Sequence, residues 1–490
     1  MKDQCVSITT DAATLTNGHP YITVTGHYIT EHWQLRDVVL AIQAAPGPHD
    51  GDHIRELLEA IQERWLLSGR VFAVVTDNGA NFVKAARIME RCEEKLRCCV
   101  HTLQLSIKDM AEAEKSTHLP WLASLVVRSR KLVSKIKNSS SLSQMLRELQ
   151  QTVQSELQEL DDNDSDPSDT QSSPSSSKTS HAYSLVKDVA TRFNTMCLVF
   201  SRLLKLKPEL ARLCEAVDDL DSLKLTEDEW NLMTSTNKVL ASIKSICDIL
   251  EGSKYPTISL LLPLLDTLCC VLNGGMKDIL DVSTLPTEVQ HLCSTLYANI
   301  NTRSCLLAPE WVIASVMLDL RLRNKLIVSE QLKKHSELAL RSLYNTFDAK
   351  RLFNVDTDAV VAHSQQEEQQ PAQRRHRSIQ DLLHAEVKAV DIVSRTETDR
   401  FLGIEKGIGF DENPLEWWRQ NKEEFPKLAQ MARVYLSVPA STAASERVFS
   451  YGNITIQQRR HSLQIDRVAR LMWMMKNMSL YRQLSETGDM

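Results

Sequence analysis

Two aspartates follow short apolar segments near the start of the chain, at positions where carboxylates could bind a divalent cation. Asp11 comes directly after the segment Cys5–Thr10, and Asp77 follows the apolar run Val71–Val75. If the two segments are neighbouring strands of one sheet, their ends bring both carboxylates side by side. A cation such as Mg²⁺ would then relieve the repulsion between them. Because Asp at a strand end is also a common turn former or helix cap, the spacing alone leaves both interpretations open.

The elements that must position these aspartates are predicted from the periodicity of apolar residues. Three strands, expected at residues 5–10, 21–29 and 33–42, are joined by short polar turns and should form an antiparallel meander. The pattern then alternates between a helix, a buried parallel strand and a second helix, at residues 54–67, 71–75 and 78–89. A meander followed by this alternation predicts a mixed sheet with helices on its faces.

The middle of the chain is predicted to be largely helical. Helices are expected over residues 102–160, over 193–214 and over 223–350, with Thr226-x-x-Glu229 as a capping box. Residues 183–189 have the pattern of one more strand.

Two segments have too few apolar residues to fold by themselves. Residues 161–178 consist mainly of Asp, Ser, Thr and Pro, and residues 363–378 are rich in Gln, Glu and Arg. Both are predicted to be disordered, because they cannot bury enough apolar surface to offset the entropy lost on ordering. The last hundred residues return to amphipathic helices.

Composition excludes several classes of protein. The chain has 490 residues, a formal net charge of −6 and 42% hydrophobic residues, which is typical of globular domains. No run of 18 apolar residues occurs, so no membrane-spanning helix is expected. The 11 cysteines include no Cys-x-x-Cys pair, and Cys98-x-x-His101 has no second pair to complete it, so no zinc finger is expected.

Several short motifs resemble the hAT superfamily of DNA transposases, and in particular their zinc-finger BED-domain relatives. The first is Thr76-Asp77-Asn78-Gly79-Ala80-Asn81, with Cys98-x-x-His101 after it, and the second is the segment 188–194. The most specific is a series over residues 413–450: the pair Trp417-Trp418, then Phe425-Pro426, then Ser445-Glu446-Arg447. A BED finger has no counterpart in front of the first predicted strand.

The resemblance implies an α/β fold, namely an RNase H-like mixed sheet interrupted by a large all-helical insertion, with a C-terminal dimerisation region. The implied catalytic acids are Asp11, Asp77 and Glu446. Their role in the family is to hold Mg²⁺ for DNA strand cleavage and transfer, so magnesium is expected only if the chain is catalytically active. Ser-Glu-Arg is also compatible with a structural role for Glu446.

The resemblance further implies contacts with DNA and with a second copy of the chain. His101, Arg192 and Phe193 correspond to DNA-contacting positions, and Phe193 replaces a tryptophan of the family but can still stack on a base. The implied dimerisation residues are large hydrophobes near the C-terminus: Trp417, Trp418, Phe425, Tyr435, Leu471, Met472 and Met475. The alternative is that they form the core of their own domain.

The expected domain organisation combines the pattern and the resemblance. Residues 1–160 and 181–215 are expected in the RNase H-like domain, separated by a linker at 161–180; residues 216–400 form the helical insertion, and 401–490 the dimerisation region that completes the sheet domain.

Two functions follow. The first is a domesticated, nuclear, homodimeric protein that acts in DNA- or chromatin-associated transcriptional regulation, without transposition and without a membrane or small-molecule partner. The alternative is a Mg²⁺-dependent DNA transposase, or a fragment of one.

Overall fold

A five-stranded mixed sheet is formed by the first hundred residues. The computed structural model describes residues 4–45, 50–90, 92–111, 119–163, 183–186, 193–323, 328–348, 352–353, 396–458 and 465–487. The strands are β1 (Val6–Thr14), β2 (Pro20–Ile29), β3 (Leu35–Ala44), β4 (Val71–Thr76) and β5 (Glu94–Arg97). Their order is β3-β2-β1-β4-β5, in which β1, β2 and β3 are antiparallel and β4 runs parallel to both β1 and β5. The predicted meander and mixed sheet are confirmed.

The first strand is longer than the sequence pattern predicts. It continues past Thr10 to Thr14, because these extra residues still pair with the start of β2, from Asp11 opposite Thr23 to Thr14 opposite Pro20. The turn that follows contains Gly18 at φ +80°, a conformation that glycine adopts without steric cost. Asp11 therefore lies within β1 rather than at its end.

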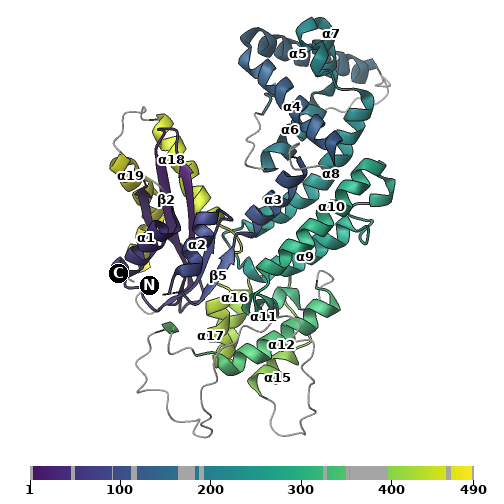
Figure 1. Ribbon diagram of the computed structural model, residues 1–490. Coiled ribbons are helices and arrows are strands. Elements are labelled where there is room, and N and C mark those ends of the chain that lie inside the picture. Colours follow the sequence, from purple (N-terminus) through teal and green to yellow (C-terminus); the bar gives the residue numbers. More distant parts are fainter. Residues whose placement is uncertain are drawn as a thin grey trace, which may run out of the picture. The chain divides into compact units, whose positions relative to one another are not determined.

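Each face of the sheet is covered by a pair of helices (Figure 1). The helices α1 (Gly51–Arg64) and α2 (Ala80–Ile88) share an apolar core with one face, which includes Ile8, Ile22, Val24, Ile54, Leu58 and Phe82. The helices α18 (Ala443–Gln458) and α19 (Ile465–Thr487) pack on the other, with a core of Leu15, Tyr21, Val39, Val448, Phe449, Val468, Ala469 and Met472. Segments separated by more than 400 residues thus complete one domain.

The chain divides into two compact units. The sheet unit comprises Met1–Thr102, Cys247–Thr267 and Arg303–Met490. Besides the helices on the sheet it contains α11 (Glu310–Leu318), α12 (Glu330–Thr346), α15 (Glu397–Leu402), α16 (Pro414–Asn421) and α17 (Pro426–Tyr435).

The helical unit comprises Leu103–Ile246 and Leu268–Thr302. Its complete helices are α4 (Pro120–Asn138), α5 (Ser140–Asn163), α6 (Phe193–Lys205) and α7 (Lys207–Ala216). It also contains most of α3 (Cys99–Ala111), α8 (Glu227–Leu250) and α10 (Thr287–Ser304), and the end of α9 (Ile258–Leu272). At the start of α8, Thr226 and Glu229 exchange side-chain to backbone hydrogen bonds, so the predicted capping box is present.

These units differ from the boundaries expected from sequence. Residues 103–160 were expected with the sheet, but α4 and α5 pack against each other and against α7 and the residues after it. Conversely, residues 303–400 were expected in the helical insertion, whereas α11 and α12 pack against α17 in the sheet unit. Helical periodicity predicts that a segment forms a helix, but it does not predict which apolar partner covers its face.

The strand predicted at 183–189 is not formed by its described part, residues 183–186. The side chain of Gln150 on α5 takes the place of a strand partner: its Nε2 donates to the Tyr183 carbonyl at 3.0 Å, and its Oε1 accepts from the Tyr183 amide at 2.6 Å. Residues 187–189 and 363–378, and all of the predicted linker after Asn163, lie outside the described residues.

Candidate functional site

Asp11 and Asp77 occupy equivalent positions on two neighbouring parallel strands. The pairing of β1 with β4 ends at Thr10 opposite Thr76, and each aspartate is the next residue. Asp11 accepts a hydrogen bond from the amide of Ala12 at 2.9 Å, and Asp77 accepts one from the amide of Gly79 at 3.1 Å. The two strand positions are therefore adjacent, as predicted. Asp77 also makes the turn contact that is expected if it is a turn former.

The electrostatic environment of Asp77 disfavours its charge. Burial is the largest influence and raises the pKa of Asp77 above the usual value, while the Gly79 amide and the nearby His101 act in the opposite direction. A Cβ at position 79 would lie 3.1 Å from the Asp77 carboxylate, so glycine permits this close approach. A partly buried carboxylate with a raised pKa is a feature that catalytic and metal sites share with some structural sites.

Glu446 lies in the first turn of α18, on the face of the sheet toward which Asp11 points. The preceding residue, Ser445, contacts Thr9 with 2.9 Å between their hydroxyl oxygens, and Ala13 packs on the α18 core. Because side chains alternate along a strand, Asp11 shares the face of Thr9 and Ala13. Glu446 also acts on the thiol of Cys98, whose pKa is raised to about 11, mainly by burial.

A buried polar cluster lies beside this turn. We define the polar cluster as Thr9, Thr25, His27 and Ser445, all of which are buried. The Thr9 and Thr25 hydroxyls are hydrogen-bonded to each other, and Thr25 Oγ1 lies 3.0 Å from His27 Nε2. Burial lowers the pKa of His27 to about 4; Arg447 acts in the same direction and Asp37 in the opposite one. His27 is therefore neutral at pH 7.

Sequence reasoning missed the polar cluster. Thr23, Thr25 and His27 alternate with apolar residues along β2, and such alternation normally marks a strand face toward water. Here that face is covered by α18, so the polar side chains bond to one another and to Ser445. The one feature of the sequence that could have indicated the polar cluster is Ser445, a hydroxyl residue at the beginning of a helix and next to the motif residue Glu446.

The three carboxylates do not form one metal site in this arrangement. In the part of the chain that the structure describes, no group of three or more His, Cys, Asp or Glu side chains is close enough together to hold a metal ion. Asp11 and Asp77 follow paired residues and Glu446 lies over the Asp11 face, but the set does not fit a magnesium centre with all three as ligands.

The predicted DNA-contacting residues belong to different parts of the chain, and only His101 has a described side chain. His101 lies on α3 near Asp77 and is partly buried. Phe193 is the first residue of α6 in the helical unit, and the position of its side chain is outside the description. Arg192 lies outside the described residues.

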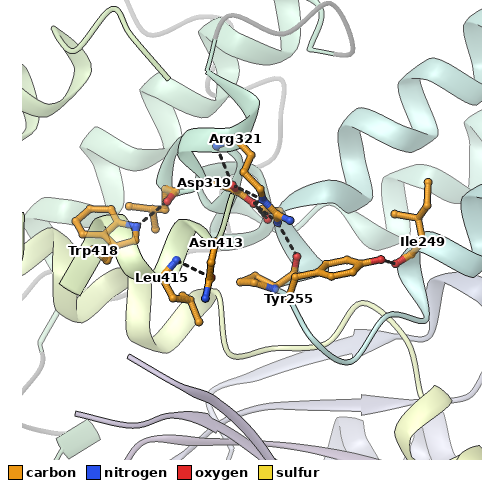
Figure 2. A network of polar contacts seen from close by, with 10 residues as sticks. Ile249, Tyr255, Asp319, Arg321, Asn413, Leu415 and Trp418 are labelled. Carbon is orange, nitrogen blue, oxygen red and sulfur yellow. Dashed lines mark hydrogen bonds and ion pairs between the residues drawn. The ribbon is translucent and has the colours of Figure 1, made fainter. Parts of the chain in front are cut away.

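Four of the predicted dimerisation residues are instead part of the chain's own core. Trp418, Phe425, Tyr435 and Met472 are all buried, with at most 3% of their surface exposed. Trp418 donates from Nε1 to the carbonyl of Leu318 at 2.8 Å (Figure 2). Its ring also stacks on that of Trp33. Side chains buried in this way cannot contact a second copy of the chain, because residues of the same chain already cover them.

The other three remain accessible. Trp417 and Leu471 are partly buried, and Met475 is 52% exposed. On the same helix, Met474 and Met478 are also exposed, at 52% and 47%, although sequence reasoning did not select them. We call Met474, Met475 and Met478 the α19 methionine patch.

No helix in the described part of the chain is both long enough and apolar enough to cross a membrane.

Comparison with protein families gives two matches. Residues 397–478 match the hAT family C-terminal dimerisation region, and residues 9–105 match the ZBED1 RNase-like domain. The first match contains Glu446 and the α19 methionine patch, and the second contains Asp11, Asp77 and His101.

Comparison with curated proteins agrees with these matches. The chain is 23% identical to a putative AC transposase of Zea mays over 93% of this chain and 54% of the relative. It is 21% identical to the putative transcriptional regulator tpeD of Talaromyces stipitatus, over 96% of this chain and 53% of that protein. It is also 21% identical to human zinc finger BED domain-containing protein 4, over 88% of this chain and 34% of that protein. The chain thus spans about half the length of the first two and a third of the last.

Proposed function

We propose that this chain is a homodimeric nuclear protein that associates with DNA or chromatin and regulates transcription. Two findings support the proposal: the matches to an hAT-type C-terminal dimerisation region and to an RNase-like domain, and the similarity to hAT transposases and BED-finger proteins. It acts without transposition. The similarity to a putative transcriptional regulator supports the regulatory role.

The observation that carries the dimer is the α19 methionine patch. Positions 474, 475 and 478 of a helix lie on one side of it, and three exposed large apolar side chains there leave a continuous apolar strip. Methionine is enriched at protein interfaces, and it adapts its shape to a partner. The strip falls within the region that matches the family's dimerisation model.

The dimer is tested by sedimentation equilibrium of the wild type and of the double variant Met475→Asp/Met478→Asp. We expect a wild-type dimer and a folded monomeric variant, because the carboxylates would be desolvated in the seam. Leu66→Asp is the matched control. Leu66 is 75% exposed and lies in the same unit but outside the residues that match the dimerisation region, so its variant should remain dimeric. A monomeric wild type at micromolar concentration contradicts the proposal.

The nuclear and regulatory parts have separate tests. A fluorescent fusion of the chain is expected in the nucleus, and the wild type tethered to a reporter promoter is expected to change transcription. The double methionine variant in the same assays shows whether regulation requires the dimer. A fusion that remains outside the nucleus rejects this part of the proposal.

A second candidate is Mg²⁺-dependent DNA strand cleavage. It is favoured by the equivalent positions of Asp11 and Asp77 on paired strands and by Glu446 on the Asp11 face. It requires the three carboxylates to approach one another when DNA binds. A nicking assay with Mg²⁺ separates the candidates: the first expects no nicking, and the second expects nicking that Asp77→Ala abolishes. Asp52→Ala, which changes an exposed aspartate on α1, is the control.

A further inference from the structure

A wide groove in the sheet unit is lined by three separate segments of the chain. Its volume is about 680 Å³. One wall is the turn between β2 and β3 with the beginning of β3, which contributes His32, Trp33 and Arg36. The second is the loop that carries Lys254, and the third is α16, with Glu416 and Arg419. None of these residues belongs to a motif that predicts binding from the sequence.

The groove has an excess of positive charge in a chain whose net charge is −6. Three of its lining residues are permanent cations, and Glu416 is the only carboxylate among them. Both Glu416 oxygens accept hydrogen bonds from Arg419, at 2.8 and 2.5 Å, so these two side chains neutralise each other and the net positive charge of the lining comes from Arg36 and Lys254. Lys254 is exposed and has no ion-pair partner among the described residues.

Arg36 lies at the boundary of the groove with a smaller cavity. Its Nη2 donates to Gln34 Oε1 at 2.5 Å, which holds the guanidinium on the groove wall. The carboxylates of Asp37 and Glu251 line the neighbouring cavity of about 30 Å³ and not the groove itself.

The walls are fixed by buried contacts, and one of them is strained. Trp33 has φ +61°, a left-handed conformation that is unfavourable for a bulky residue. Its ring nevertheless stacks on Trp418 of α16, with the two planes 13° apart and the centroids separated by 6.2 Å. The fold therefore accepts backbone strain to hold the β2–β3 turn against α16. Strained residues of this kind cluster at functional sites.

The loop with Lys254 is anchored on both sides (Figure 2). The Tyr255 hydroxyl donates to the carbonyl of Ile249 at 2.8 Å, and Arg321 Nη2 donates to the carbonyl of Pro256 at 3.0 Å. Arg321 is itself held by a buried ion pair with Asp319, with 2.6 Å between Nη2 and Oδ2. Lys254 thus extends from a rigid loop, which lowers the entropy cost of binding.

We propose that this groove binds the phosphodiester backbone of DNA. The net positive charge comes from two separate segments along an open groove, at Arg36 and Lys254, and does not converge on one point, which suits an extended polyanion better than a single phosphate group. Because Lys and Arg contact phosphates without reading base edges, the binding is independent of sequence and falls steeply with salt. This inference rests on the DNA association proposed above and assigns it a surface.

The test is fluorescence anisotropy with a labelled DNA duplex of mixed sequence, between about 50 and 200 mM salt. The double variant Arg36→Gln/Lys254→Gln is expected to bind roughly 10- to 100-fold more weakly at about 0.1 M salt. The slope of log K against log salt is expected to decrease in magnitude by about 2, since each phosphate contact contributes about 0.9.

Lys95→Gln is the matched control, because Lys95 is an exposed lysine on β5, at the edge of the sheet opposite β3. Its affinity should change by less than about twofold, as expected for one cation outside the contact surface. The single variant Lys254→Glu, at an exposed position, provides a second reading that does not depend on Arg36, and melting temperatures of all variants verify folding.

Three outcomes overturn the proposal in distinguishable ways. If the wild type binds DNA but the groove variants lose no more affinity than Lys95→Gln, the groove is not the site while DNA association stands. If the wild type does not bind DNA at low salt, the DNA association proposed above fails as well. If inorganic pyrophosphate displaces DNA at equal phosphate concentration, the groove is a site for a small phosphate ligand instead.

Discussion

The two faces of the five-stranded sheet are built from the same strands but by different means. One face is covered by α1 and α2, which follow directly in sequence, and its buried side chains are mostly apolar, with Gln62 of α1 and Thr10 of β1 as polar exceptions. The other is covered by α18 and α19, which begin more than 350 residues after the end of α2, and it combines an apolar core with the polar cluster. We call them the local face and the distant face.

The two faces differ in what they contribute to the protein: the local face contributes mainly stability, and the distant face carries the candidate site. The local face buries mainly apolar side chains, which gain free energy from leaving water, so it contributes stability. The distant face buries hydroxyls and an imidazole at the cost of desolvation, and it is the face that Asp11 and Glu446 share. Polar groups are buried where they fix the position of one helix turn, and that turn carries Glu446.

The largest effect is expected on the local face. Ile8→Ala should lower the free energy of unfolding by about 3 kcal/mol, because Ile8 is completely buried beneath α1 and α2 and its removal leaves a cavity. Urea denaturation measures the loss. Leu66→Ala, at an exposed position, is the control and should change stability by less than about 0.5 kcal/mol.

Acid should destabilise the distant face selectively. His27 has a pKa of about 4 when folded and about 6.5 when unfolded, so the unfolded chain binds a proton that the folded chain excludes. The stability from neutral His27 is therefore complete above pH 6.5 and is lost as the pH falls toward 4, by an amount on the order of 2–3 kcal/mol. Melting temperatures across this range measure it.

The variant His27→Gln should remove that part of the pH dependence and leave the carboxylate contributions. Should the variant and the wild type show the same acid profile between pH 6.5 and 4, His27 is not protonated on unfolding as proposed here.

Loss of one hydroxyl should have a smaller effect. Ser445→Ala removes the contact that joins Thr9 to α18 while keeping the helix turn and the bond of Thr9 to Thr25, and we expect a loss of about 1 kcal/mol in unfolding free energy. Ser450→Ala is the control, since Ser450 is exposed on the same helix. Equal effects of the two changes would show that the polar cluster does not hold α18.

The smallest effect is expected at Asp77, and it has the opposite sign. Burial raises its pKa in the folded chain, so its charge at pH 7 opposes folding. Asp77→Asn retains the acceptor for Gly79 and should stabilise the protein by about 0.5–1 kcal/mol at pH 7. The gain should vanish below pH 4, where both side chains are neutral; a loss of stability at pH 7 would contradict this reading.

Local patterns in the sequence predicted the local face well. The strands β1 to β4 and the first two helices were predicted within about four residues, because apolar periodicity reports directly on burial, whereas the short edge strand β5 was not predicted. The position of Asp11 beside Asp77 followed from the same pattern, and the resemblance to hAT proteins supplied Glu446.

The distant face could not be predicted in the same way. Nothing in the β2 pattern distinguishes His27 facing water from His27 covered by α18, since the two differ only in tertiary packing. Trp418 gives the converse case: its size and motif suggested an interface, but a Trp33 ring nearly 400 residues away in the chain occupies its surface. The groove at Lys254 could not be predicted either, because its lining comes from three segments that are far apart in the sequence.

The separation between Thr9 and Ser445, 436 residues, has a consequence for synthesis. At about 5–20 residues per second, a ribosome needs about 20–90 s to add the residues between them. During that time the strands are made but Tyr21 and Val39, which α18 and α19 later cover, have no partner helices. The nascent chain thus exposes an apolar sheet surface until its final segment emerges, and a cellular chaperone is the expected occupant of that surface.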